Sequence, residues 1–188
     1  MKGRIWTVPN QITLLRLGFL PIFLILIAYD RYRWALLVLV VSGLSDGIDG
    51  LLARSLNQRS ALGAYLDPIA DKLLLSSSFV VLAFKKQLAW WLTILVLSRD
   101  VLILIVAVVI LLVLGYRPFP PSIYGKLTTA TEITLVFLVV LGAAYPNYHT
   151  GVLNHFFIYA VTVLSVLSGL HYSFTTARHL SSSTPEPK

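Results

Sequence analysis

The chain has 188 residues, of which 57% are hydrophobic and only 12% are charged. Soluble domains carry about 25% charged residues, so this composition predicts a protein whose main solvent is lipid. Cysteine is absent, which excludes disulfides, thiolate chemistry and cysteine-based zinc sites. The net charge of +7 is scattered between apolar runs rather than gathered in one stripe, so we expect anionic lipid and not nucleic acid as the partner.

Six apolar segments follow one another along the chain, each close to the roughly 20 residues that a spanning helix needs. We predict spanning helices over residues 12–29, 34–54, 68–84, 88–114, 123–145 and 152–176. The fourth segment contains Arg99 and Asp100 but no proline or glycine before Gly115, so we expect one helix there. The prediction is therefore an all-α, polytopic membrane domain over residues 1–180, with a disordered polar tail over 181–188.

The distribution of lysine and arginine predicts the orientation of these helices. With the N-terminus inside, eight basic residues fall on the cytoplasmic side and four on the other. We therefore expect both termini, and the connection between the second and third helices, in the cytoplasm. Only nine residues precede Asn10 and no small-residue cleavage site follows the first apolar run, so no signal peptide is expected. A bacterial or archaeal plasma membrane is the predicted location.

Four of the eight acidic residues lie within 26 residues, at Asp46, Asp49, Asp67 and Asp71. Spacings of three and four residues project the members of each pair about 60° and 40° apart on a helix. Helices joined by a short connection usually pack side by side and antiparallel, so the two pairs can face one another. We expect Asp67 at the N-cap of the third helix.

The expected helix start also involves two neighbours of Asp67. We predict that Gly63 ends the connection between the second and third helices and that Pro68 occupies the first helical position. An isolated aspartate pair in a membrane is often a salt bridge or a proton relay. Four neighbouring carboxylates instead require cations, because their mutual repulsion would otherwise protonate them.

The ligand chemistry narrows the choice of cation. Carboxylate oxygens without histidine or cysteine suit Mg²⁺ or Mn²⁺ rather than Zn²⁺. Two such ions can clamp an in-line displacement at phosphorus. The pattern therefore predicts a two-metal site for phosphate chemistry at the cytoplasmic ends of the second and third helices.

The same residues form a longer motif. The run Asp46-Gly47-Ile48-Asp49-Gly50-Leu51-Leu52-Ala53-Arg54, followed by Gly63, Asp67 and Asp71, resembles the signature of the CDP-alcohol phosphatidyltransferase family. That signature is D-x2-D-G-x2-A-R-x8-G-x3-D-x3-D, and every fixed position is filled. The resemblance extends over most of the chain, through the Pro9-Asn10 entry to the first helix and the count of six helices.

The resemblance implies an integral-membrane enzyme that moves the phosphatidyl group of CDP-diacylglycerol to an alcohol hydroxyl and releases CMP. It implies that Asp46, Asp49, Asp67 and Asp71 bind two Mg²⁺ or Mn²⁺ ions. Asp71 would also be the general base that deprotonates the acceptor. Residues implied to contact the CDP moiety are Gly50, Arg54, Ser60, Asn10 and Thr13. Arg54 would lie on the diphosphate, and the alternative for Asn10 is a helix N-cap.

The acceptor is predicted from features that are less specific than the aspartate motif. Residues 63–72 resemble the subgroup of phosphatidylglycerophosphate synthases and cardiolipin synthases, and Ser98-Arg99-Asp100 resembles the cardiolipin synthases. We predict glycerol-3-phosphate as acceptor because that function is commoner in bacteria, with phosphatidylglycerol as the alternative. Arg99, Lys126 and Arg16 are the predicted ligands of the acceptor's phosphate, unless Arg99 only neutralises Asp100.

We expect a homodimer. The competing class of function is a small ion-coupled transporter with the acids on its pathway, but such carriers usually show inverted repeats and helices broken at the midplane. No repeat is evident here, and the acids lie near one end of their helices.

Overall fold

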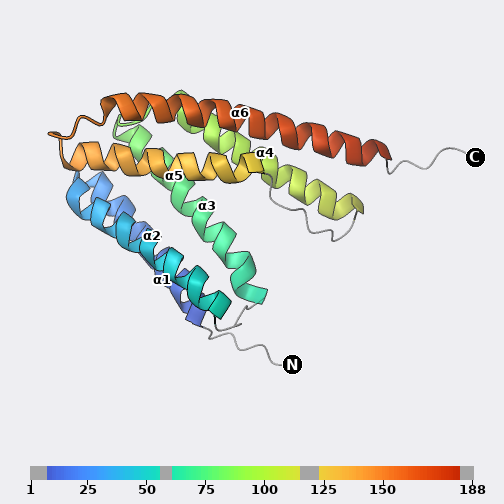
Figure 1. Ribbon diagram of the computed structural model, residues 1–188, viewed down its shortest axis with the longest axis horizontal. Coiled ribbons are helices and arrows are strands. Elements are labelled where there is room, and N and C mark those ends of the chain that lie inside the picture. The colour runs from blue at the N-terminus through green and yellow to red at the C-terminus, as the bar shows by residue number, and fades with distance from the viewer. Residues whose placement is uncertain (1–7, 56–60, 115–122, 183–188) are drawn as a thin grey trace, which may run out of the picture. The chain divides into compact units, whose positions relative to one another are not determined.

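The computed structural model describes residues 8–55, 61–114 and 123–182, and the surroundings of side chains within 17–45, 72–106, 123 and 125–172. The described residues form six α-helices and no strand (Figure 1). They are α1 (Val8–Ala28), α2 (Tyr32–Ser55), α3 (Ala61–Phe84), α4 (Trp90–Leu114), α5 (Ile123–Ala144) and α6 (Gly151–Ser182). The predicted all-α class and the order of its elements are confirmed.

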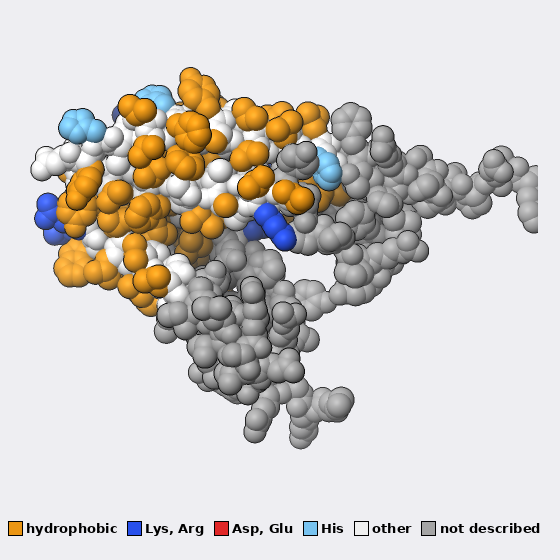
Figure 2. Space-filling model, in the orientation of Figure 1, with side chains coloured by type: hydrophobic (Ala, Val, Ile, Leu, Met, Phe, Trp, Pro, Cys, Tyr) orange, Lys and Arg blue, Asp and Glu red, His pale blue; other side chains and the backbone are white. Residues whose placement is uncertain are grey.

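Length and composition mark some of these helices as able to cross a membrane. Within the described residues, Gly125–Ala144 and Gly151–Tyr172 are long and apolar enough to span one. Shorter apolar stretches cover Leu17–Ala28, Tyr32–Ser45 and Lys72–Phe84. Large hydrophobic side chains cover much of the described surface that is visible in Figure 2. These features fit a membrane protein, while the six-span topology and its orientation stay predictions.

Several helix boundaries differ from the prediction. α3 begins at Ala61 and not at residue 68, so the predicted roles of Gly63 as a loop end, Asp67 as an N-cap and Pro68 as the first helical residue are wrong. Proline lacks an N–H, and inside a helix it removes the bond to the carbonyl four residues earlier, here that of Ala64. The surrounding apolar segment continues the helix through that interruption. α1 likewise contains Pro21 within its length.

Two other boundary predictions have clear outcomes. α4 is one uninterrupted helix through Arg99 and Asp100, as predicted. α6 continues to Ser182, so the first two residues of the expected tail are helical, and residues 183–188 lie outside the described part of the chain.

The chain divides into two compact units. The first contains α1, α2, α3 and the C-terminal part of α5 from Val136, and within it α1 packs against both α2 and α3. Its fully buried side chains include Phe23, Ile27, Phe79 and Leu82. The second unit contains α4, α5 up to Leu135, and α6 from Leu153. Fully buried side chains of this unit include Leu92, Val96, Leu135 and Val161.

α1 and α3 end in the same way. Asp30 and Lys86 follow these helices with φ of 58° and 57°, in the left-handed region that favours glycine. In each case this residue donates its N–H to the carbonyl three residues earlier, and the next residue donates to the carbonyl five residues earlier. These bonds are the Schellman pattern, which satisfies carbonyls that the helix end leaves open. The four distances are Asp30 N to Ile27 O 3.0 Å, Arg31 N to Leu26 O 2.8 Å, Lys86 N to Ala83 O 3.0 Å and Gln87 N to Leu82 O 2.9 Å.

Lys85 joins these two helix ends to one another. Its Nζ lies 2.6 Å from Asp30 Oδ1 and donates a hydrogen bond of 3.2 Å to the carbonyl of Ala28, the last residue of α1. The hydrogen bond from Lys85 lowers the pKa of Asp30 below its ordinary value, so the carboxylate stays ionised at neutral pH. The C-terminal ends of α1 and α3 therefore lie together at one end of the first unit.

The left-handed backbone at Lys86 leads to a stability prediction. Lys86→Gly should raise the thermal midpoint in detergent, because glycine adopts this conformation without the cost of about 1 kcal/mol that a Cβ imposes. Lys86→Ala is the matched control, since it removes the same side chain and keeps the Cβ. Equal midpoints for the two variants would show that the backbone conformation carries no cost at this position.

Candidate functional site

The four predicted metal-binding aspartates lie on two consecutive helices. Asp46 and Asp49 are in the C-terminal half of α2, and Asp67 and Asp71 are in the N-terminal half of α3. Both stretches are continuous helix, so the predicted angles of about 60° and 40° within the two pairs apply. These residues lie outside the described side-chain surroundings, so their ligation of metal stays a prediction.

The backbone brings the two pairs to the same end of the first unit. Only residues 56–60 separate Ser55, the last residue of α2, from Ala61, the first of α3. A chain of that length spans at most about 20 Å, and both helices pack on α1 (Figure 1). If the carboxylates of the two pairs meet there, as the sequence predicts, they would offer oxygen donors alone, which suit hard divalent cations.

The predicted CDP contacts lie toward the same end. Gly50 and Arg54 follow the first aspartate pair in α2. α1 reverses into α2 through Tyr29–Arg31, so the N-terminal half of α1 lies beside the C-terminal half of α2. The N-terminal half of α1 carries Asn10, Thr13 and Arg16. Val8 and Pro9 are already helical, so Asn10 lies within the first turn and the N-cap alternative is wrong. Ser60 lies outside the described residues.

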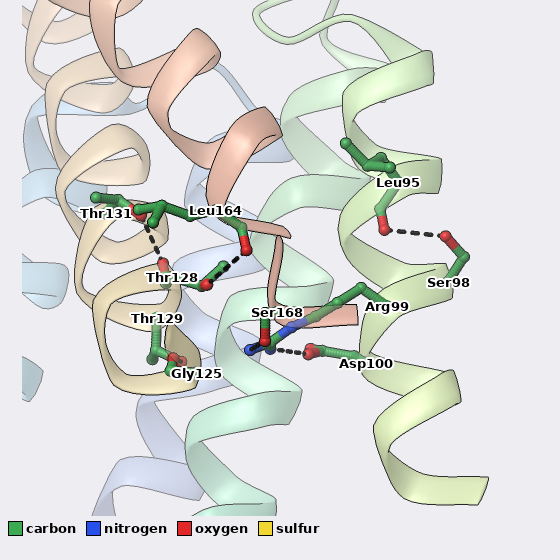
Figure 3. Close-up of polar contacts among 10 residues, drawn as sticks. All are labelled: Leu95, Ser98, Arg99, Asp100, Gly125, Thr128, Thr129, Thr131, Leu164 and Ser168. Atoms are coloured by element: carbon green, nitrogen blue, oxygen red, sulfur yellow. Dashed lines mark hydrogen bonds and ion pairs between the residues drawn. The ribbon is translucent and has the colours of Figure 1, made fainter. Parts of the chain in front are cut away.

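The second unit contains a buried ionic network around Arg99. The Arg99 residue is 7% exposed, and its Nη1 lies 2.7 Å from Asp100 Oδ1. Its Nη2 donates a hydrogen bond of 3.0 Å to Ser168 Oγ on α6 (Figure 3). The pairing of Arg99 with Asp100, which the sequence offered as an alternative, is confirmed as a contact. Asp100 and Ser168 together hold two of the three guanidinium nitrogens.

α5 reaches the same turn of α6. Thr128 is fully buried and donates from Oγ1 to the carbonyl of Leu164 at 3.3 Å (Figure 3). Leu164 and Ser168 are four residues apart, which is close to one helical turn. One turn of α6 therefore accepts hydrogen bonds from both α4 and α5. Lys126, the predicted acceptor ligand on α5, lies two residues before Thr128 and is exposed.

Two donors in this unit have no hydrogen-bond partner among the described residues. They are Arg99 Nε and the hydroxyl of Ser165, which is 1% exposed. A buried donor without a partner costs about 1–3 kcal/mol, which favours a bound water or ligand atom in that position. The guanidinium thus keeps one buried donor beyond its contacts with Asp100 and Ser168.

Thr128, Ser165 and Ser168 are buried polar residues of this unit that the sequence did not single out, beside Glu132, whose charge interrupts an apolar segment. Thr128 and Glu132 are four residues apart on α5, and Ser165 and Ser168 are three apart on α6, and all four are at most 1% exposed. Such spacings place each pair on one helix face. Polar pairs at helical spacing inside apolar segments were therefore a usable signal for this network.

Comparison with known proteins identifies relatives over most of the chain. Residues 6–167 match the family model described as CDP-alcohol phosphatidyltransferase. A Streptomyces coelicolor protein named cardiolipin synthase (CMP-forming) is 42% identical over 67% of this chain and 61% of its own length. A Mycobacterium tuberculosis protein named probable phosphatidylglycerophosphate synthase is 34% identical over 91% of this chain and 82% of its own length. The human cardiolipin synthase (CMP-forming) is 34% identical over 92% of this chain and 64% of its own length. The chain thus spans less than two thirds of the Streptomyces and human proteins.

The network around Arg99 predicts a coupled effect on stability. Arg99→Gln should destabilise the protein by up to about 3–5 kcal/mol, because it removes the cation that pairs with the largely buried Asp100 carboxylate. Arg99→Gln with Asp100→Asn should recover most of that loss. Thermal unfolding in detergent compares the variants, with Ser98→Ala, an exposed neighbour, as control. A double variant no more stable than Arg99→Gln would contradict a charge-neutralising role for Asp100.

Proposed function

The chain belongs to the CDP-alcohol phosphatidyltransferase family, and on that basis we propose that it transfers the phosphatidyl group of CDP-diacylglycerol to a glycerol-type hydroxyl and releases CMP. One observation supports this proposal above all. The two aspartate pairs lie in the C-terminal half of α2 and the N-terminal half of α3, which a short connection joins. The motif that resembles the family signature falls entirely within the matched residues 6–167.

The proposed reaction is a displacement at the lipid-side phosphorus. The acceptor oxygen forms a bond to that phosphorus, the bond between the phosphorus and the CMP oxygen breaks, and the hydroxyl proton passes to Asp71. Arg54 would hold the diphosphate through a charge-assisted hydrogen bond, and Gly50 leaves room for the nucleotide beside the α2 backbone. Asn10, Thr13 and Ser60 are the proposed further contacts to CDP. Positioning and charge neutralisation supply most of the rate in such a transfer.

We propose that two Mg²⁺ or Mn²⁺ ions complete this site. The family is generally dependent on divalent metal. The proposed ligands are the carboxylates of Asp46, Asp49, Asp67 and Asp71, whose all-oxygen chemistry suits hard cations. Bound divalent cations would neutralise charge on the diphosphate and on the leaving group.

The acceptor is the finer part of the proposal. Two points favour glycerol-3-phosphate. Its use as acceptor is the commoner function in bacteria, and a relative named as a phosphatidylglycerophosphate synthase aligns with 91% of the chain. Phosphatidylglycerol is favoured by observations on this chain itself. These are the Ser98-Arg99-Asp100 sequence and the 42% identity to a protein named cardiolipin synthase. We therefore propose phosphatidylglycerol as the first acceptor to test, beside glycerol-3-phosphate.

Both acceptors carry a phosphate that needs cationic donors. We propose that Arg99, Lys126 and Arg16 supply them. Arg99 supports this role because its Nε–H is buried and has no hydrogen-bond partner among the described residues. Lys126 supports it because its side chain is exposed near the start of α5. The contact between Arg99 and Asp100 then orients the guanidinium rather than excluding a ligand.

The arrangement of the chain in the membrane is also proposed. We propose a multi-pass plasma-membrane protein with six spans, both termini in the cytoplasm and the aspartates on the cytoplasmic side. This orientation puts eight basic residues on the cytoplasmic side and four on the other, which supports it. The enzyme domain over residues 1–180 and the homodimer remain predictions from the sequence.

The reaction itself is tested with purified protein and CDP-diacylglycerol. Phosphatidylglycerol and glycerol-3-phosphate are offered separately, and release of CMP is measured with and without a chelator. We expect release with at least one acceptor, its loss in chelator, and its return with Mg²⁺ or Mn²⁺. Full turnover in excess chelator would contradict the two-metal site. Failure to bind CDP-diacylglycerol would favour the transporter alternative.

Asp71 as general base gives a sharper prediction. Asp71→Asn keeps the size of the side chain and removes the proton acceptor, so CMP release should fall by at least ~10²-fold. Binding of CDP-diacylglycerol should weaken less than in Asp49→Ala, which removes a proposed metal ligand only. Near-normal turnover of Asp71→Asn would reject the assignment.

The acceptor pocket is tested at the exposed lysine. Lys126→Gln should raise the Michaelis constant for the acceptor several-fold, because it removes a cation from a phosphate site, and leave that for CDP-diacylglycerol nearly unchanged. Lys126→Arg, which keeps the charge, is the matched control. Unchanged acceptor kinetics in Lys126→Gln would remove this residue from the pocket.

A further inference from the structure

The end of the first unit that lies away from the aspartates carries a concentration of exposed basic residues. The C-terminal end of α1, the N-terminal end of α2 and the C-terminal end of α3 meet there, joined by the contact between Lys85 and Asp30. We call the exposed residues Arg31, Arg33 and Lys86 at this end the distal rim. Along α2 it lies about 20 Å from Asp46, at a rise of 1.5 Å for each of the residues from Tyr32.

The charge of the distal rim is not balanced within the described part of the first unit. The only acidic residue in 17–45, 72–88 and 136–152 is Asp30. Its carboxylate lies 2.6 Å from Lys85 Nζ, so Lys85 and Asp30 neutralise each other. Arg31, Arg33 and Lys86 then carry three positive charges, and no ion pair involves them among the described residues. These exposed cations repel one another weakly, and a bound anion would offset that repulsion.

Arg33 is held in place by contacts that leave its charge available. Its Nε donates to the carbonyl of Ala144 at 3.4 Å, and its guanidinium carbon lies 5.3 Å from the centre of the Tyr145 ring. Contact with an aromatic face and a backbone carbonyl orients a guanidinium without neutralising it. The terminal nitrogens of Arg33 therefore remain as a pre-oriented fork of the kind that binds phosphate in a bidentate manner.

The side chains around the rim indicate the source of the anion. Tyr29 and Trp34, next to the rim in sequence, are 75% and 62% exposed. Aromatic residues of this kind concentrate where the bilayer meets water. Ile25 and Leu37, one to two turns further along α1 and α2, are also exposed and would contact acyl chains. Cations, then aromatic rings, then aliphatic side chains follow the order of head group, interface and hydrocarbon in a phospholipid leaflet.

We propose that the distal rim binds the phosphate of an anionic phospholipid head group, on the membrane face opposite the aspartate site. The proposal rests on the membrane-spanning arrangement given above, but not on the identity of the acceptor. Arg33 and Arg31 contact the phosphate and Lys86 adds charge. The lipid held there is separate from any lipid substrate, because the two sites lie at opposite ends of α2.

The experiment measures stabilisation by lipid in the Asp49→Ala background, where binding at the aspartate site is already impaired. The protein in detergent is titrated with phosphatidylglycerol, phosphatidylcholine or inorganic phosphate, and the thermal midpoint is followed. We expect a saturable rise with phosphatidylglycerol only. Adding Arg31→Gln with Lys86→Gln should weaken the apparent affinity by roughly 5-fold for each charge removed. Arg31→Lys with Lys86→Arg, which keeps both charges, should retain it.

Three results would overturn the proposal. They are equal stabilisation by phosphatidylcholine, stabilisation by inorganic phosphate alone, and unchanged affinity in the Arg31→Gln/Lys86→Gln variant. The pair of substitutions leaves Arg33 and its contacts with Ala144 and Tyr145 in place, so the variant is expected to fold. The outcome is independent of CMP release, so it separates this site from the proposed enzyme activity.

Discussion

An ionised group surrounded by hydrocarbon has no water to solvate it, and its counter-charge must come from the protein or from a bound ion. Two ion pairs show how this chain meets the constraint. Arg99 meets Asp100 and Ser168 inside the second unit, and Lys85 meets Asp30 at the end of the first. The four aspartates of α2 and α3 pose the same problem with the opposite sign. The two divalent cations that we propose there would solve it, and they would place positive charge where the proposed diphosphate reacts.

The ionic contacts also explain how so few polar residues organise the helices. In an apolar setting the hydrophobic effect barely distinguishes one helix neighbour from another, so packing and hydrogen bonds set the arrangement. In the second unit, Arg99 and Thr128 bring two helices to α6 through single hydrogen bonds. In the first, Lys85 and Arg33 join loop ends that are far apart in sequence. Each of these contacts uses a backbone carbonyl or a short hydroxyl side chain as acceptor.

The sequence predicted the helices, which depend on local composition, and missed side-chain contacts between residues that are far apart in the chain. Apolar length was enough to find six helices, and the lack of glycine or proline before Gly115 was enough to keep α4 whole through Arg99. The start of α3 was missed because Pro68 looks like a helix beginning, whereas the loss of one bond to Ala64 is tolerated inside a longer helix. The aspartate site was predicted from clustering, spacing and the family motif, and its ligand role stays a prediction. Ser168 was not predicted, because its partner Arg99 is 69 positions away and no local pattern links them.

The two hydrogen bonds on one turn of α6 have a consequence for motion. A helix that slides by one residue moves 1.5 Å and rotates about 100°. Such a step would carry Ser168 away from Arg99 and the Leu164 carbonyl away from Thr128 at the same moment. A rigid slide of α6 would therefore break both contacts. Sliding or screw motion of this helix is opposed by two bonds that break together, whereas bending of α6 beyond this turn leaves both bonds in place.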